Sequence, residues 1–349
     1  SKSDYIIGAA NKGNVITDCN DEAIYTWGDK NVTIKGNFIG LDPDGTTISA
    51  NGEALRLNVE GPGYLNIGGA NAGEGNIISG NGSGGIQVYA NGTDPNIDIN
   101  ITNNIIGLDY TGTVAKGNDD MGIYIANSSF NFNFYSSATI TGNIVSDNGS
   151  YGDDAIRVTE AEDLVITNNY VGSDINGEND FGCSGTGIWI YDINTSADVS
   201  GNVVIGNDEG INLTSDLIGT VVDNNKVGVD ATGNVIVGHD DYGVYLSIDN
   251  VDGLTLSNNT ISGNGNSSFD DAIYVAANNN IISGNTIGLN AAGTAALGNL
   301  GTGIFQHVSY GSNKISNNIV SANGGEGIEV TGDNNILTGN IIGTDATSS

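Results

Sequence analysis

Pairs of adjacent acidic residues are the features of this sequence whose types and spacing could do chemistry. The pairs are Asp21–Glu22, Asp119–Asp120, Asp153–Asp154, Asp208–Glu209, Asp240–Asp241 and Asp270–Asp271. Two neighbouring carboxyl groups can share the acid and base roles in glycoside hydrolysis, or they can offer oxygen ligands to Ca²⁺. Carboxylates this close also repel one another, so water, protons or a cation must relieve the repulsion. The pairs therefore predict a hydrolytic site, a cation site or a row of solvated acids.

The hydrolytic interpretation starts at "GDDAIRV", residues 152 to 158. This segment resembles the paired-aspartate motif of the polygalacturonases, a family of β-helical hydrolases, and the resemblance implies Asp153 and Asp154 as catalytic carboxyls. In "GHDDYG", His239 next to Asp240 and Asp241 forms a second candidate. The family's Asn-Thr-Asp, Gly-His-Gly and Arg-Ile-Lys segments are all missing from the sequence. Because the acid pair recurs, which one active site does not require, repetition explains it more simply, and no catalytic residue is favoured.

The charge of the chain excludes several other functions. Nine Lys and Arg residues stand against 41 Asp and Glu in 349 residues, which gives a formal net charge of −32. Nucleic acids and anionic membranes need basic residues to neutralise phosphate, so we expect neither as a partner. Polysaccharide lyases use Lys or Arg to bind uronates, which nine scattered basic residues do not favour. The longest apolar runs are a few residues long, so no membrane-inserted segment is expected.

The acid pairs belong to an internal repeat. A signature of Asn, any residue and then Ile or Val recurs twelve times, and alternate copies continue as "IGLD" or as "ISGNG". The repeat unit is therefore a pair of coils, each of roughly 30 residues, a size typical of solenoid proteins. The Asn residues of the signature are Asn14, Asn37, Asn76, Asn104, Asn143, Asn169, Asn202, Asn225, Asn259, Asn285, Asn318 and Asn340.

Each coil contains strand-like patterns. Apolar and polar residues alternate before the Asn, as in "IDINITNN" at 97 to 104, and again after the following turn, as in "GIYI" at 122 and "GIWI" at 187. This alternation has the period of a strand, and no helical pattern of useful length occurs. We predict an all-β chain, folded over residues 1–349 as a single right-handed parallel β-helix of about twelve coils, with the repeated Asn residues stacked as a ladder.

The Asn-x-Ile signature and segments such as "IGTDAT" and "ALGN" also resemble the parallel β-helix repeat family of secreted and surface-attached bacterial and archaeal proteins. The resemblance covers essentially the whole chain. It implies an extracellular or cell-surface protein, but it does not select a function, because β-helices include enzymes, adhesins and structural fibres.

An outward column is predicted in the second strand of each coil. In the Gly-Ile-x-Ile pattern the apolar residues point inward and x points outward. Six of the eleven x residues are aromatic, in a chain that is only 7% aromatic, so the column favours stacking on sugars or packing against a protein. The alternative is that these aromatic residues pair with one another across strands and only stabilise the sheet. The column is Tyr25, Arg56, Gln87, Tyr124, Arg157, Trp189, Asn212, Tyr245, Tyr274, Phe305 and Glu329. The binding candidates within it are Tyr25, Tyr124, Arg157, Trp189, Tyr245, Tyr274 and Phe305.

Calcium is the one cofactor that the sequence suggests, because Asp/Asn/Gly turns can supply several oxygen ligands. The candidate ligands are Asp119, Asp120, Asp153, Asp154, Asp240, Asp241, Asp270 and Asp271. Neither an EF-hand loop nor the Gly-Gly-x-Gly-x-Asp nonapeptide is present, so solvated turn acids are the competing interpretation.

The favoured function is a non-catalytic structural or adhesive β-solenoid, and the alternative is a secreted polysaccharide hydrolase. The expected partners are carbohydrate, neighbouring solenoid segments or other copies of the chain stacked end to end, since no capping element is recognisable in the sequence. Twelve coils at ~4.8 Å predict a rod of roughly 60 Å. Cys19 and Cys183 lie about six coils apart, beyond the reach of a disulfide, so we expect two reduced, partly buried thiols.

Overall fold

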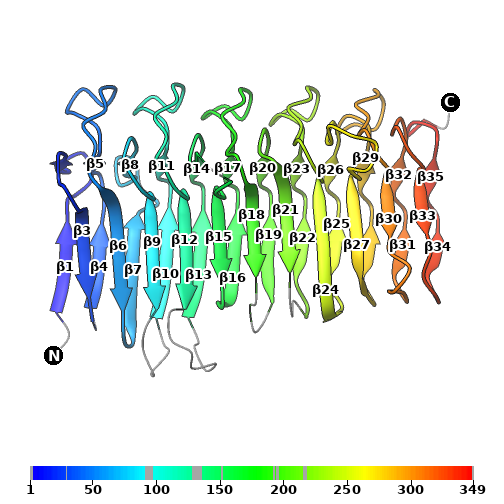
Figure 1. Ribbon diagram of the computed structural model, residues 1–349, viewed down its shortest axis with the longest axis horizontal. Coiled ribbons are helices and arrows are strands. Elements are labelled where there is room, and N and C mark those ends of the chain that lie inside the picture. Colours follow the sequence, from blue (N-terminus) through cyan, green and yellow to red (C-terminus); the bar gives the residue numbers. More distant parts are fainter. Residues whose placement is uncertain are drawn as a thin grey trace.

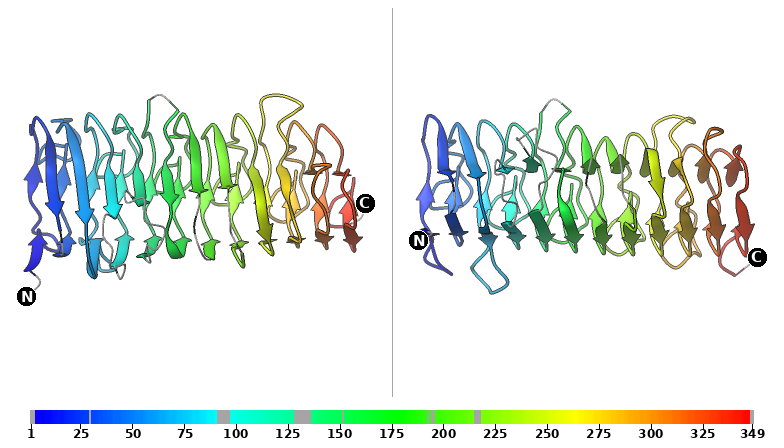
Figure 2. Two further views of the ribbon diagram at one scale, coloured as in Figure 1. Left: turned by 60° about the horizontal axis from the view of Figure 1, so that its bottom comes forward. Right: turned by 90° about the horizontal axis from the view of Figure 1, so that it is seen from below.

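The computed structural model shows a right-handed parallel β-helix whose two ends carry the two ends of the chain (Figure 1). It describes residues 3–28, 30–90, 97–127, 136–150, 152–191, 193, 196–214 and 218–347. Three parallel sheets, here sheets A, B and C, run along the rod, and each described coil except the last adds one strand to each sheet in turn (Figure 2). None of the residues described is helical, so no helix in this part of the chain could span a membrane. The predicted fold class is confirmed.

Sheets A and B each contain twelve strands, and sheet C contains eleven. Sheet A consists of β1 (Ser3–Ile7), β4 (Lys30–Ile34), β7 (Gly63–Gly68), β10 (Ile97–Thr102), β13 (Ser136–Thr141), β16 (Glu162–Thr167), β19 (Ala197–Ser200), β22 (Val221–Asp223), β25 (Thr255–Ser257), β28 (Ile281–Ser283), β31 (Lys314–Ser316) and β34 (Ile336–Thr338). Sheet B consists of β2 (Val15–Ile16), β5 (Phe38–Ile39), β8 (Ile77–Ile78), β11 (Ile105–Ile106), β14 (Ile144–Val145), β17 (Tyr170–Val171), β20 (Val203–Val204), β23 (Lys226–Val227), β26 (Thr260–Ile261), β29 (Thr286–Ile287), β32 (Ile319–Val320) and β35 (Ile341–Ile342). Sheet C consists of β3 (Glu22–Trp27), β6 (Glu53–Val59), β9 (Ile86–Ala90), β12 (Ile123–Asn127), β15 (Ile156–Thr159), β18 (Thr186–Tyr191), β21 (Glu209–Thr214), β24 (Val244–Asp252), β27 (Ile273–Asn278), β30 (Ile304–Gln306) and β33 (Ile328–Val330).

Alternation along each strand builds the core. In β10, Ile97, Ile99 and Ile101 are buried while Asp98 is exposed. The same inward positions are stacked from coil to coil, as in the register Leu65↔Ile99↔Ala138, so the core is one continuous column of aliphatic side chains. A slip of one residue would turn this column outward, which is why the pattern specifies the register strongly.

The predicted Asn ladder is confirmed over all twelve residues. The Nδ2 amide of each of the first eleven Asn residues donates to Oδ1 of the Asn in the next coil, at distances of 2.9–3.1 Å. Inside the rod a second Nδ2 hydrogen bond reaches a backbone carbonyl of the preceding coil, for example from Asn169 to Ile140 at 2.9 Å. Because these polar groups are buried, the ladder satisfies them and fixes the turn between sheets A and B.

A second ladder follows sheet B and was not predicted from the sequence. In most of its steps the backbone N–H of one member donates to a side-chain acceptor of the next coil. Its members are Cys19, Asn51, Asn81, Asn118, Asn148, Cys183, Asn207, His239, Asn264, Asn299 and Asn323. Both cysteines are free, as expected; Cys19 is partly buried, as predicted, whereas Cys183 is fully buried. Both cysteines and His239 therefore occupy positions that the other coils give to Asn.

Longer loops leave alternate coils at one edge of the rod, at the top in Figure 1, and they form a third ladder. The residue after the loop Asp or Asn donates its N–H to a Gly carbonyl two coils earlier, as from Tyr110 to Gly45 at 3.0 Å and from Ile175 to Gly112 at 2.9 Å. The same bond recurs at Ala231, Ala291 and Ala346. The repeating pair of coils seen in the sequence is thus a pair in space, because loops bond across the intervening coil.

We expect Gly187→Ala to lower the free energy of unfolding by about 1–3 kcal/mol, because overpacking forces the surrounding structure to shift. A Cβ atom at Gly187 would lie 2.6 Å from Val204 Cγ1 and 2.9 Å from the Gly210 carbonyl oxygen. Gly82→Ala is the matched control, since its nearest atom would be 3.4 Å away. Urea denaturation of both variants measures the difference, and equal stabilities would contradict the packing described here.

Candidate functional site

The outward column predicted in sheet C is a single row in the structure. All eleven residues, from Tyr25 on β3 to Glu329 on β33, are paired in register from coil to coil. We call this row the sheet C stripe. It runs parallel to the rod axis, so its side chains form one linear surface and not a set of separate patches.

Aromatic rings are in contact along the C-terminal half of the stripe. The rings of Tyr245 and Tyr274 are stacked, with centroids 4.9 Å apart, and Phe305 continues the row 5.4 Å from Tyr274. Tyr242, just outside the stripe, contacts both tyrosines at 5.2 and 5.4 Å. Burial and the acids around Tyr242 raise the pKa of its phenol, so it stays a hydrogen-bond donor. Because Tyr274 lies between two rings, this cluster offers ring edges and hydroxyl groups more than open ring faces.

Arg157 and Trp189 form a different unit in the middle of the stripe. The Arg157 guanidinium lies 3.9 Å from the centre of the Trp189 ring, and its Nε atom lies 2.6 Å from Asp154 Oδ2. The Nε–Oδ2 pair is a close charge contact without the alignment of a hydrogen bond. Arg157 therefore already has an anionic partner, and it covers one face of the indole that was predicted to contact sugar.

Highly exposed aromatic side chains lie at the N-terminal end of the stripe and in the loop before β27. Tyr25 and Trp27 on β3 are 51% and 56% exposed, and Phe269 is 82% exposed in the loop before β27. Asp270 Oδ2 holds this loop by accepting the N–H groups of Asn266 and Ser267, at 3.1 and 2.7 Å. Phe269 was missed from the sequence because it lies in a loop, outside the alternating pattern. Its place directly before the Asp270–Asp271 pair is the signal that could have identified it.

The acid pairs lie at two different spacings before the strands of sheet C, and this spacing determines which acid of a pair is buried. Asp153–Asp154 and Asp270–Asp271 directly precede Ala, and the second acid of each pair is buried. In Asp119–Asp120 and Asp240–Asp241 an extra residue, Met121 or Tyr242, separates the pair from the strand and is itself half-buried, and the first acid of each pair is exposed. The candidate acids therefore lie along one edge of sheet C, but they do not form equivalent rungs.

Burial raises the pKa of several of these carboxyls. The pKa of Glu209 is raised to about 7, mainly by burial, with a further contribution from the charge of Asp241. That of Asp271 is raised to about 6 by burial, in spite of the N–H of Thr302 that it accepts at 2.8 Å. Burial and then the charge of Asp270 raise the pKa of Asp241. Proton uptake by these carboxyls thus relieves part of the repulsion between neighbouring acids.

A metal centre is not assembled in the described part of the chain, where no three His, Cys, Asp or Glu side chains gather closely enough to hold an ion. Binding of Ca²⁺ by the paired acids therefore stays a prediction from the sequence.

The alternative catalytic residues lie in separate coils, with Asp153 and Asp154 before β15 and with His239, Asp240 and Asp241 before β24. His239 is 2% exposed and lies in the second ladder, whereas its neighbour Asp240 is exposed. Burial lowers the pKa of His239 to about 4, although backbone hydrogen bonds with Val204 and Asn207 oppose the shift. Asp154 is buried against Arg157 and accepts the Thr186 N–H at 2.8 Å, while Asp153 is half-buried beside it. Asp154 and His239 thus serve local structure.

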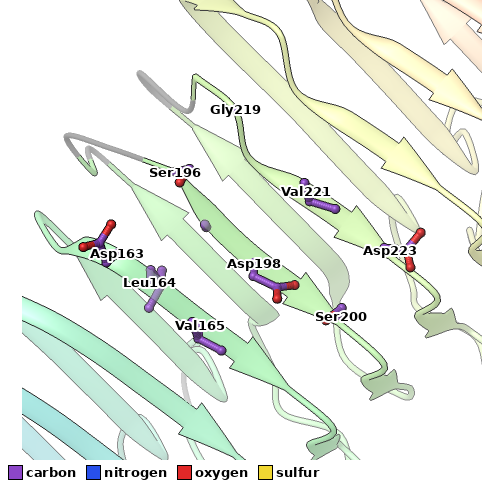
Figure 3. A pocket seen from close by; sticks show the side chains of 10 residues that line it. Asp163, Leu164, Val165, Ser196, Asp198, Ser200, Gly219, Val221 and Asp223 are labelled. Atoms are coloured by element: carbon purple, nitrogen blue, oxygen red, sulfur yellow. The ribbon is translucent and has the colours of Figure 1, made fainter.

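A separate open groove of about 450 Å³ lies on the outer face of sheet A (Figure 3). Val165, Asp198 and Val221 form a row across β16, β19 and β22 at its floor. Asp163 and Asp223 lie at its rim, where Asp223 accepts the hydroxyl of Ser257 at 2.6 Å. None of the described residues that line the groove is aromatic, so this lining differs chemically from the sheet C stripe.

Fold and ladders together define the class of this protein as a right-handed parallel β-helix with two side-chain ladders. No protein-family model, no curated protein and no solved structure shows a significant match to the chain. Function is therefore inferred from the chemistry of the surface described above.

Proposed function

We propose that this protein is a non-catalytic structural or adhesive β-solenoid that binds carbohydrate along the sheet C stripe. The observation that carries the proposal is the unbroken register of the stripe, which places eleven outward residues, six of them aromatic, in one line. A linear surface of this kind fits a linear polymer better than a small compact ligand. Aromatic rings bind the apolar faces and edges of sugars, and the flanking carboxyls accept hydrogen bonds from sugar hydroxyls.

The charge of the protein selects among carbohydrates. A net charge of −32 repels a polyuronate unless cations bridge the two, so neutral glycans are the preferred ligands. Beside the stripe, the surface around Phe269 and Tyr242 is the strongest candidate, since Phe269 is highly exposed and directly precedes the Asp270–Asp271 pair.

An extracellular or cell-surface location, in the family of secreted β-helix repeat proteins, is part of the same proposal. Its support is the Asn-x-Ile repeat over the whole chain and a surface suited to polysaccharide. Hydrolysis is the less supported alternative, because Asp154 is engaged with Arg157 and His239 is held inside the rod.

We expect the wild-type protein to bind a subset of neutral glycans on an array and to release no reducing sugar from them. Phe269→Ala should weaken this binding about tenfold, the equivalent of the 1.4 kcal/mol that one lost aromatic contact can cost. Tyr64→Ala is the control, because Tyr64 is a half-buried tyrosine on sheet A, away from the stripe. Binding by no neutral glycan would refute the proposal, and release of reducing sugar would establish the hydrolase.

A further inference from the structure

We propose that the glycan bound by this protein is an extended, neutral, β-1,4-linked chain that runs along the rod axis with one sugar per coil. This inference rests on the proposed function, and it names the class of glycan that the sheet C stripe accepts. Three features carry it: the spacing of the aromatic rings in the C-terminal half of the stripe, the residues that end this row of rings, and the charge around it.

The rings form a row along the rod axis. Tyr245, Tyr274 and Phe305 are paired in register on β24, β27 and β30. The centroids of neighbouring rings are 4.9 and 5.4 Å apart, so one ring follows the next at every coil. The row therefore presents one aromatic contact per coil, at a similar interval and in one direction.

Further aromatic side chains widen this row along the strands. Before β24, the ring of Tyr242 lies 5.2 and 5.4 Å from those of Tyr245 and Tyr274. After β30, the ring of His307 lies 6.4 Å from that of Tyr274, and the ring of Tyr310 lies 5.8 Å from that of His307. A surface wider than one ring suits a sugar chain, because hydroxyl groups project from both edges of such a chain. We call this surface the aromatic patch, and its members are Tyr242, Tyr245, Tyr274, Phe305, His307 and Tyr310.

The interval between the rings selects the linkage of the glycan. In a β-1,4-linked chain of glucose both linking bonds are equatorial, so the chain is straight and each sugar advances by about the length of its own ring. An α-1,4-linked chain of the same sugar has one axial bond, so it curves into a helix and leaves a straight row after a few residues. Aromatic rings that follow one another at 4.9 and 5.4 Å therefore match successive sugars of the straight chain.

Charge around the aromatic patch selects a neutral chain. Asp241 directly precedes Tyr242, and the pair Asp270–Asp271 lies just before β27. The segments that carry the patch, 240–247, 269–278 and 301–310, contain no Lys or Arg. Carboxyls accept hydrogen bonds from sugar hydroxyls but repel the carboxylates of uronates, and the net charge of −32 adds to this repulsion. The complementary partner is therefore a neutral sugar chain.

The row of rings has a defined length. Asn212 precedes Tyr245 in the register of the stripe, and Glu329 follows Phe305. Neither residue is aromatic, so the ring contacts end at these two positions. One sugar per ring then gives a site of about three sugars, and a longer chain gains no further contact with this row.

Calorimetric titration with oligosaccharides of increasing length tests the proposal. The β-1,4-linked series are cello-, xylo- and manno-oligosaccharides, and malto-oligosaccharides are the matched control, because they differ from the cello series only in the linkage. For at least one β-1,4-linked series we expect the affinity to rise roughly threefold to tenfold from the disaccharide to the trisaccharide, the gain of one aromatic contact, and to level off beyond about four sugars. The malto series should show no such rise.

The outcomes separate this inference from the proposed function. An equal rise in the malto series, or neutral glycans bound on the array with no rise in any β-1,4-linked series, would overturn the inference and leave carbohydrate binding in place. Binding of no neutral glycan at all would overturn both.

Variants of the middle ring test the register of one sugar per coil. Tyr274→Ala should lower the affinity for the tetrasaccharide about tenfold and abolish the rise from the disaccharide to the trisaccharide. Tyr274→Phe keeps the ring and should keep the rise, and Tyr64→Ala, on sheet A, should bind as the wild-type protein does. Thermal unfolding confirms that each variant is folded. A folded Tyr274→Ala protein with the wild-type dependence on chain length would overturn the inference.

Discussion

Asn259→Ala should lower the free energy of unfolding by about 3–5 kcal/mol, the largest loss expected for a single substitution that creates only a small change in volume. Asn259 lies in the first ladder on the turn between β25 and β26. Its Oδ1 atom accepts the backbone N–H and the Nδ2 hydrogen of Asn225, at 2.8 and 3.0 Å. Its Nδ2 atom donates to Asn285 Oδ1 at 3.0 Å and to the Val222 carbonyl at 2.9 Å.

The size of this effect follows from burial. Alanine removes four hydrogen bonds at once and leaves the backbone N–H of Asn225 and the carbonyl of Val222 inside the rod without these partners. Each buried polar group that loses its partner costs about 1–3 kcal/mol. The loss is concentrated at one junction between coils, so hydrogen exchange at the Asn225 amide should accelerate together with the change in global stability.

Asn266→Ala provides the control for this substitution. Asn266 is exposed, and its described hydrogen bonds come from the backbone N–H, which alanine keeps. We expect its unfolding curve in urea to lie within about 0.5 kcal/mol of wild type. If Asn259→Ala and Asn266→Ala were equally stable, the ladder would be a by-product of stacking and not a source of stability.

Acidification should destabilise the wild-type protein relative to His239→Asn by about 3 kcal/mol between pH 6.5 and pH 4. Burial lowers the pKa of His239 from 6.5 to about 4. The unfolded chain then binds a proton at a pH where the folded chain does not, so the stability that neutral His239 supports is present above pH 6.5 and is lost as the pH falls. One pKa unit corresponds to about 1.4 kcal/mol, so lowering the pKa from 6.5 to about 4 corresponds to about 3 kcal/mol of stability.

The contacts of His239 in the second ladder explain why the folded protein favours the neutral ring. The Nε2 atom of His239 is 3.0 Å from the Val204 carbonyl, and Nδ1 is 3.2 Å from the backbone nitrogen of Asn207, whose N–H it accepts in the neutral ring. Protonation of Nδ1 removes that acceptor inside the rod. Asparagine fills this position in most other coils, so His239→Asn should fold and keep an acceptor for the Asn207 N–H.

Urea denaturation of both proteins from pH 4 to pH 8 measures the difference. Glu209 and Asp271 act in the opposite direction in this range, because their raised pKa values favour the folded state as the pH falls, but both proteins contain them and the contribution cancels. His307→Asn, which replaces the other histidine and keeps His239, should retain the wild-type profile. Parallel profiles for wild type and His239→Asn would show that His239 does not titrate on unfolding.

The sequence alone determined the coils, the first ladder and the sheet C stripe. Asn104 and Ile99 are placed by the sequence pattern itself, because strand alternation and a recurring Asn leave one register in which the apolar residues are all inside. The stripe residues follow from the same rule, since most of them stand between two buried aliphatic side chains, as Tyr124 stands between Ile123 and Ile125. The coils, the ladder and the stripe are all encoded by a short local pattern that recurs in every coil. A single short strand leaves its register ambiguous, and the repetition removes that ambiguity.

Only the tertiary structure decided what lies between the strands and how neighbouring coils meet. His239 was a catalytic candidate in the sequence and is a ladder residue in the fold, because its alignment with Asn207 and Asn264 depends on how loops of different length close each coil. Arg157 and Trp189 are adjacent rungs in the predicted column, but only the structure shows that the guanidinium covers the indole and lies against Asp154. Burial of one acid in a pair and stacking of rings both arise from contacts between coils some 30 residues apart, and no local pattern encodes these contacts.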